Sequence, residues 1–270
     1  MAADAKNVIS IIRERSEVSH FSRLKSYPDG SWELMACSSD VFRDAGYEPV
    51  DKPVHKSNVS HKRDTSDERS VQDVERARRR AASAVRDLAL CNDFRWFVTL
   101  TLDQQRIDRY DMGAIMRRVN QWLSNAVRRQ GLRYVLVPEL HKDGAVHFHG
   151  FFSDSLAAVD SGHKDSGGHA VYNLPQWKFG FTAAIELYGS YHSAVGYVCK
   201  YVRKQDTKIG GRWYYSGGAL RKPDVTYGDV ALRDLVEQGA YTFRVPGAMF
   251  AILRGGEVDE RCLVCGAPQD

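Results

Sequence analysis

Short runs rich in β-branched and aromatic residues alternate along this chain with segments of helical periodicity, and this alternation limits the folds open to it. Helical spacing of apolar residues recurs in two segments, 111–130 and 191–205. The predicted strands are RWFVTLTL (95–102), RYVLVPEL (133–140), AVHFHGFF (145–152), FTAAIEL (181–187) and a candidate fifth, RWYYSG (212–217). This order predicts an α+β fold, a central antiparallel sheet of about five strands with helices packed on one face, the other face being left for a ligand.

Four regions follow from this pattern. Residues 1–65 form a variable N-terminal region with a candidate strand near 31–36, and residues 66–92 are a basic helix that begins at Ser66 or Asp67 and leads into the core as a helical N-terminal extension. The core domain spans 93–230, and 231–270 is a C-terminal tail. Within the core, residues 155–174 are rich in Gly, Ser, Asp and His and are predicted to be a loop.

Composition narrows the setting. A formal net charge of +4 and a pI near 8.7 permit a polyanionic partner without requiring one. Five scattered cysteines do not suggest a disulfide framework and favour a reducing cytoplasm. No apolar run reaches the roughly 18 residues of a membrane span, and the first residues lack the apolar core of a secretion signal, so we expect no membrane association and no export.

Two histidines share one side of a predicted strand. Side chains alternate along a strand, so His147 and His149 point the same way, about 7 Å apart, and Phe148 points into the core. Such a pair can bind a metal ion, although two packed histidines would show the same spacing. Glu139 ends the preceding strand and can complete a site with two imidazoles and one carboxylate, and His141 in the connecting turn is a competing third ligand.

A second motif lies in the predicted helix 191–205. Tyr197 and Tyr201 are four residues apart, and so are Lys200 and Lys204, which places each pair on one stripe of the helix. Tyrosines at this spacing commonly serve packing, which would leave the paired lysines unexplained. A phenol, with a pKa of about 10, needs a metal ion or nearby cations to act as a nucleophile at neutral pH.

Arginines gather on the helix 66–92, and Arg203 follows the tyrosine motif. They are interpreted either as a solvated helix face or as contacts to nucleic-acid phosphates. The candidates for phosphate contact are Arg78, Arg79, Arg80 and Arg203.

The pattern His147-Phe148-His149 followed by the doubled Tyr-x-x-Lys resembles the HUH endonuclease superfamily. It is most similar to rolling-circle replication initiators of single-stranded DNA phages and related plasmids. Phe97-Val-Thr-Leu-Thr101 matches the leading strand of that family, and Cys91-Asn-Asp-Phe94 before it is also similar. The resemblance covers roughly Leu90 to Gly228, so the 93–230 region corresponds to the HUH endonuclease domain.

The resemblance implies a mechanism. Glu139, His147 and His149 would bind Mg²⁺ or Mn²⁺, and a tyrosine would attack a phosphate of single-stranded DNA, leaving a 3′-OH primer and a 5′-phosphotyrosine. Tyr201 with Lys204 would be the first nucleophile pair, and Tyr197 with Lys200 the second. The resemblance also implies single-stranded DNA at a replication origin as substrate, a host helicase and DNA polymerase as partners, and the bacterial host cytoplasm as location.

Other interpretations of the motifs stay open. A transposase or conjugative relaxase would use the same chemistry, although their motif layouts fit this chain less well. A non-catalytic single-stranded nucleic-acid-binding module would use the sheet to stack bases, with the histidines packed. A metal hydrolase would use water and leave the tyrosine helix unexplained. Cys262 and Cys265 form half of a zinc-binding pattern without an obvious second pair, and no metal is assigned there.

Overall fold

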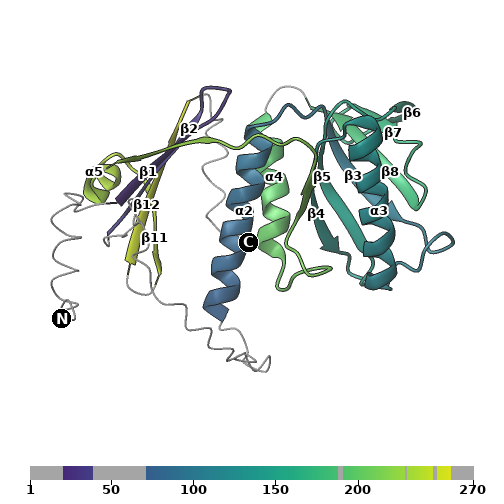
Figure 1. The fold of residues 1–270 in the computed structure, drawn as a ribbon, viewed down its shortest axis with the longest axis horizontal. Coiled ribbons are helices and arrows are strands. Elements are labelled where there is room, and N and C mark those ends of the chain that lie inside the picture. Colours follow the sequence, from purple (N-terminus) through teal and green to yellow (C-terminus); the bar gives the residue numbers. More distant parts are fainter. Residues whose placement is uncertain (1–20, 39–70, 188–190, 229, 246–247, 257–270) are drawn as a thin grey trace, which may run out of the picture. The chain divides into compact units, whose positions relative to one another are not determined.

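The structure is a computed structural model that describes residues 21–38, 71–187, 191–228, 230–245 and 248–256 (Figure 1). The described residues fall into two compact units. One combines strands from near both ends of the chain, and the other lies within residues 69–223 apart from a short turn at 27–29. The predicted α+β class is confirmed, with antiparallel pairing throughout both sheets.

The first unit is a five-stranded sheet in the order β10-β1-β2-β12-β11. Its one described helix, α5, buries Leu235 against Ala36 and Ala251 of the sheet. The elements are β1 (Phe21–Ser26), β2 (Trp32–Cys37), β10 (Asp224–Gly228), α5 (Leu232–Glu237), β11 (Tyr241–Val245) and β12 (Ala248–Gly255).

This unit corrects the predicted end regions. The strand expected near 31–36 is present as β2, but residues 231–270, predicted to be a tail, contain β11 and β12. Ala251 of β12 pairs with Ala36 of β2, so the two ends of the chain share one sheet. Each strand needs a partner about 200 residues away in sequence, and local patterns do not reveal such a partner. Residues 1–20 and 39–70, including the predicted helix start at Ser66 or Asp67, lie outside the described residues.

The second unit is a seven-stranded sheet in the order β6-β7-β8-β3-β5-β4-β9. The predicted strands are all present, including the fifth. The elements are α2 (Val71–Leu90), β3 (Trp96–Leu102), α3 (Met112–Gln130), β4 (Tyr134–Leu140), β5 (Val146–Phe152), β6 (Val159–Lys164), β7 (Ala170–Asn173), β8 (Gly180–Glu186), α4 (Tyr191–Lys204) and β9 (Tyr215–Gly217).

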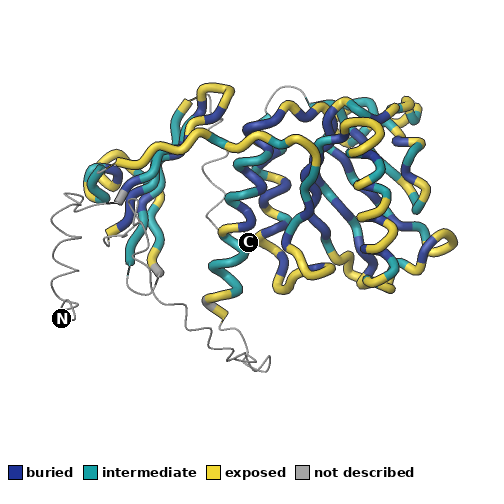
Figure 2. Tube along the Cα trace, viewed as in Figure 1, coloured by how far each residue is buried: buried dark blue, intermediate teal, exposed yellow. Residues whose placement is uncertain are grey.

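Helices cover both faces of this sheet, which corrects the prediction of one covered face. Helix α3 packs on the face that presents Leu100 and Phe148, whereas α2 and α4 pack on the face that presents Val137 and Phe151 (Figure 1). The reason is visible in β4, where residues 134–138 are buried at every position, so neither face of the central strands meets water (Figure 2).

The predicted loop at 155–174 is also corrected, because it contains the hairpin β6–β7. Hydrogen bonds of β7 to β8 add this hairpin to the edge of the sheet. Asp165 closes its turn by accepting from the backbone N–H groups of Gly167 and His169. The side chains of β6 are mostly exposed, so backbone pairing rather than an apolar pattern defines this strand.

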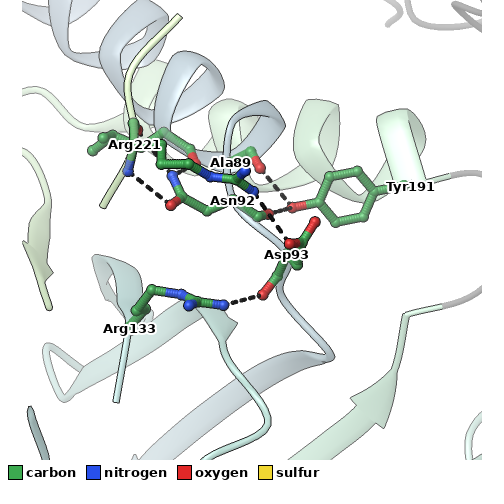
Figure 3. Close-up of polar contacts among 7 residues, drawn as sticks. Ala89, Asn92, Asp93, Arg133, Tyr191 and Arg221 are labelled. Atoms are coloured by element: carbon green, nitrogen blue, oxygen red, sulfur yellow. Dashed lines mark hydrogen bonds and ion pairs between the residues drawn. The ribbon is translucent and has the colours of Figure 1, made fainter. Parts of the chain in front are cut away.

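A buried asparagine joins the end of α2 to the segment after β9 (Figure 3). Its Nδ2 donates to the carbonyl oxygens of Leu88 and Arg221 at 2.8 and 3.0 Å, and its Oδ1 accepts from the N–H of Arg221 at 2.9 Å. This residue, Asn92, belongs to the Cys91–Phe94 segment. The Tyr191 hydroxyl at the start of α4 donates to Ala89 in the same turn. The segment therefore fixes the α2–α4 pair at one end.

Two expectations concern the setting of the protein. Across the described helices, none combines the length and apolar character that a bilayer span requires. Cys37, Cys91 and Cys199 are buried thiols without a disulfide, and Cys262 and Cys265 lie outside the described residues.

Candidate functional site

The candidate site lies on the sheet face that α4 partly covers. His147 and His149 are on β5, between β3 and β4. Phe148 between them is fully buried in the core on the opposite side, as alternation predicts. Glu139 of β4 pairs directly with His147 across the strands, so the tight hairpin brings the carboxylate to the histidines.

Glu139 contacts one histidine closely. Its Oε2 lies 3.0 Å from Nε2 of His149. The His147 ring instead stacks on His141, with ring centroids 4.9 Å apart, and His141 Nδ1 lies 3.7 Å from Asp143. Across the described ranges, no three His, Cys, Asp or Glu side chains are grouped tightly enough to enclose a metal ion as they stand.

Two threonines of β3 lie opposite the histidines. Thr99 Oγ1 is 3.2 Å from Nδ1 of His149, and Thr101 Oγ1 is 3.4 Å from Nδ1 of His147. If each Nδ1 carries the proton and donates it to the threonine, each Nε2 keeps its lone pair for a ligand. Histidines that bind metals are commonly oriented in this way by a second hydrogen bond.

The surroundings hold both imidazoles neutral. Burial lowers the pKa of His149 to about 4. Burial also lowers the pKa of His147, and repulsion from His141 and His149 acts in the same direction. Only a neutral imidazole has a lone pair for a metal ion, so this electrostatic setting suits coordination.

The predicted tyrosine stripe approaches this cluster from α4. The helix buries a stripe that includes Val195, Val198 and Val202, which leaves the tyrosines on its flank. The Tyr201 ring lies flat on the His149 ring, with centroids 4.2 Å apart and planes 4° from parallel. Its hydroxyl donates to the hydroxyl of Tyr197, which is 49% exposed. The histidine strand and the tyrosine helix therefore meet at Tyr201.

The two tyrosines differ in their surroundings. Burial raises the pKa of the Tyr201 hydroxyl above its ordinary value, and the hydrogen bond to Tyr197 and the charge of Glu139 raise it further. Lys200 and Lys204 lie on the exposed stripe next to the tyrosines, as predicted, and no ion pair joins either one to another described residue. Ionising Tyr201 thus requires added positive charge, and two lysines lie on the same helix.

Gln205 anchors the end of the tyrosine helix to the sheet. This buried side chain donates from Nε2 to the carbonyl oxygen of Pro138 at 2.6 Å, next to Glu139. Arg78 of α2 donates to the Gln205 carbonyl at 3.3 Å, which caps the C-terminus of α4. Arg78, a candidate phosphate contact, therefore has a structural role.

The remaining basic candidates differ in position. Arg79 pairs with Glu75 at 3.1 Å on the same helix. Arg80 and Arg203 are exposed, on α2 and on the last turn of α4 respectively. The structure thus brings Glu139, His149 and Tyr201 into contact, with His147 beside them, and leaves the arginines on other surfaces or in helix contacts.

Reasoning from sequence missed three residues of this site, Thr99, Thr101 and Gln205. The threonines had a detectable signal, since alternation in WFVTLTL places both on the face opposite Val98 and Leu100. Their pairing with the histidines depends on the β3–β5 register. Gln205 had no such signal, because its partner is a backbone carbonyl on a distant strand.

Comparison with known proteins gives one family. Residues 95–206 match the family model described as replication-associated protein ORF2. No curated protein and no solved structure matches the chain significantly. The matched segment runs from the start of β3 to the end of α4 and includes Thr99, Glu139, both site histidines and both tyrosines. In this segment, less than half of the chain, the protein is similar to replication-associated proteins, and the similarity indicates a role in replication.

Proposed function

We propose that the protein is an HUH-type rolling-circle initiator that nicks and joins single-stranded DNA through a tyrosine. The observation that carries the proposal is the stacking of Tyr201 on His149, which itself contacts Glu139. A nucleophile and a set of candidate metal ligands therefore share one small region. The matched replication-associated family supports the biological setting.

The residues present fit a divalent metal ion in donor type. Glu139, His147 and His149 would hold it through one carboxylate and two Nε2 atoms, and Thr99 and Thr101 would orient the imidazoles. Bound Mg²⁺ or Mn²⁺ would act as a Lewis acid that polarises the scissile phosphate. Two imidazoles are soft donors for Mg²⁺, so tighter binding of Mn²⁺ is expected.

The chemical step is a transesterification. The Tyr201 oxygen attacks phosphorus, a tyrosyl O–P bond forms, and the bond between phosphorus and the 3′ oxygen breaks. The phenol proton leaves Tyr201, and the departing 3′ oxygen takes up a proton to become a 3′-OH primer. Tyr197, hydrogen-bonded to Tyr201, is positioned to perform the second transfer that rejoins a strand.

The lysines supply charge to this step. Lys204 and Lys200 each lie three residues after a tyrosine on the exposed side of α4. Their ammonium groups would favour the phenolate and offset negative charge that develops on the phosphate oxygens. The substrate in this proposal is single-stranded DNA at a replication origin, and a host helicase and polymerase extend the primer in the bacterial cytoplasm.

The testing experiment incubates the protein with Mn²⁺ and single-stranded oligonucleotides from its own replicon. A denaturing gel and mass analysis then detect a covalent adduct. We expect an adduct on Tyr201 that Tyr201→Phe abolishes while DNA binding persists. Tyr197→Phe is the matched control and should retain the first nick.

Two outcomes would change the proposal. Nicking at the wild-type rate by Tyr201→Phe would make Tyr197 the initiating nucleophile. Absence of any adduct with the correct origin and either metal would favour the non-catalytic single-stranded nucleic-acid-binding module.

A further inference from the structure

The row of candidate site residues extends across two more strands to an exposed phenylalanine. Glu139 pairs with His147, His147 pairs with Thr101, and Thr101 pairs with Phe181 of β8. Directly paired residues point to the same face of a sheet, so Phe181 lies on the face of the histidines. It is two strand spacings, about 10 Å, from His147.

Phe181 is unusually accessible for its type. Its side chain is 65% exposed, the largest exposure of any phenylalanine among the described residues. The neighbours on this face of β8 and β7 are Ala183, Ile185 and Val171, all half-buried. Where the chain is described, none of these four side chains belongs to either core of the unit.

The opposite face of β8 is ordinary core. Ala184 is fully buried with the α3 side of the sheet, and Thr182 accepts a hydrogen bond from the N–H of Leu174. The apolar character of Phe181 therefore does not serve the core. It provides an apolar platform in line with the candidate metal ligands.

We propose that Phe181 stacks a base of the single-stranded DNA whose phosphate lies at Glu139, His147 and His149. The inference rests on the proposed function and adds where the strand runs, outward from the histidines over β3 and β8. Every base has a π-face, so an exposed ring binds single strands with little sequence preference. In a duplex the stacked bases are not available to this ring.

The charge around the platform suits a polyanion. Lys178 is exposed in the segment that leads into β8, and Lys200 is exposed on α4. The carboxylate of Glu186 on β8 pairs with Arg95, and Glu186 faces the α3 side because it is directly opposite the buried Trp96. The platform thus combines an apolar ring with nearby cations, as single-stranded DNA requires.

The test compares two probes of equal length without metal, so that no nicking takes part. One is oligo(dT), and the other has the same sugar–phosphate backbone with every base removed. For wild-type protein, the abasic probe should bind more weakly. Phe181→Ala should weaken oligo(dT) binding by about 5- to 100-fold, as expected for one lost stacked base, with little effect on the abasic probe.

Controls separate stacking from folding. Phe181→Trp keeps a π-face and should preserve the preference for oligo(dT). Val159→Ala removes apolar surface from an exposed strand position elsewhere and should change neither affinity. A loss of affinity by Phe181→Ala that is equal for both probes, or no loss at all, would overturn the stacking site.

The two proposals fail separately. An adduct on Tyr201 together with unchanged oligo(dT) binding by Phe181→Ala would reject the platform and keep the nicking activity. A Phe181-dependent preference for bases without any adduct would keep the platform and reject the nicking activity.

Discussion

At the scale of single residues, the site depends on strand alternation on two neighbouring strands. His147 and His149 face the same way because they are two positions apart on β5, and Thr99 and Thr101 face them for the same reason on β3. The antiparallel register then gives each imidazole one hydroxyl partner. A side chain at Gly150, next to His149, would collide with the backbone of Val135, which explains a glycine there.

The threonines yield a prediction about metal affinity. Thr99→Val keeps the shape of the side chain but removes the hydroxyl that orients His149. We expect Mn²⁺ affinity to fall by about 10- to 100-fold, the usual effect of losing such a partner. The measurement is Mn²⁺ titration followed by electron paramagnetic resonance or calorimetry, without DNA.

Two comparisons sharpen this test. Thr99→Ser keeps the hydroxyl and should retain most of the affinity. Thr101→Val should have the smaller effect, because its hydroxyl is 3.4 Å from Nδ1 of His147 rather than 3.2 Å. Unchanged Mn²⁺ affinity in both valine variants would show that the hydroxyls do not orient metal ligands.

At the scale of elements, the site requires α4 to be held against β4 and β5. Small side chains make close packing with α2 feasible, since Ala82 and Val85 of α2 meet Val198 and Cys199 of α4 in one core. The Asn92 cluster fixes one end of this helix pair, and Gln205 fixes the other. Tyr201 lies one turn before the Gln205 anchor.

Gln205 yields a prediction about stability. Gln205→Leu preserves volume but leaves the Pro138 carbonyl, and its hydrogen bond at 2.6 Å, without this donor. We expect the free energy of unfolding to fall by about 1–3 kcal/mol. The lower end is favoured, because Gln205 Oε1 is itself buried without a described hydrogen-bond donor. Equilibrium unfolding in urea measures the change.

The matched control is the next residue in the chain. Asp206 is exposed, and Asp206→Asn should change stability by less than about 0.5 kcal/mol. Equal stability of the Gln205→Leu and Asp206→Asn variants would mean that the Gln205 hydrogen bond does not hold α4 to the sheet.

At the scale of the whole molecule, the chain forms two units that differ in how they use the sequence. The seven-stranded unit is made almost entirely from one continuous stretch and contains two large cores, one on each face of its sheet. The five-stranded unit needs β1 and β2 from one end of the chain and β10 to β12 from the other. The region matched to the replication-associated family lies entirely within the first of these.

This organisation predicts that a fragment of residues 69–223 folds alone. Its cores and sheet pairings are nearly complete without the remaining chain, so we expect cooperative thermal unfolding by circular dichroism. The fragment should also form the tyrosine adduct in the assay proposed above. The complementary truncation, residues 1–68, lacks the β12 partner of β2 and should not form a stable sheet.

A fragment that is unfolded, or folded without Mn²⁺ binding, would show that the five-stranded unit is required for the catalytic region. The matched control is the full-length chain, measured in the same buffer. A stable sheet in residues 1–68 alone would contradict the dependence of β1 and β2 on the C-terminal strands.

Local periodicity in the amino-acid sequence was sufficient for one group of features. Alternation placed His147 and His149 on one side, and helical spacing placed Tyr197 with Tyr201 and Lys200 with Lys204. The hairpin turn brought Glu139 beside the histidines. Each of these depends only on the backbone geometry of one element or of two elements joined by a short turn.

Which surfaces meet became known only from the three-dimensional arrangement. An apolar stripe shows that a helix is covered on one side without identifying the covering element, so the opposite placement of α3 and α4 was not predictable from it. The strands β6, β7, β11 and β12 were missed because long-range backbone pairing defines them. The contact of Tyr201 with His149, the threonine partners and the exposed row ending at Phe181 likewise depend on register and packing between distant segments, which sequence periodicity does not encode.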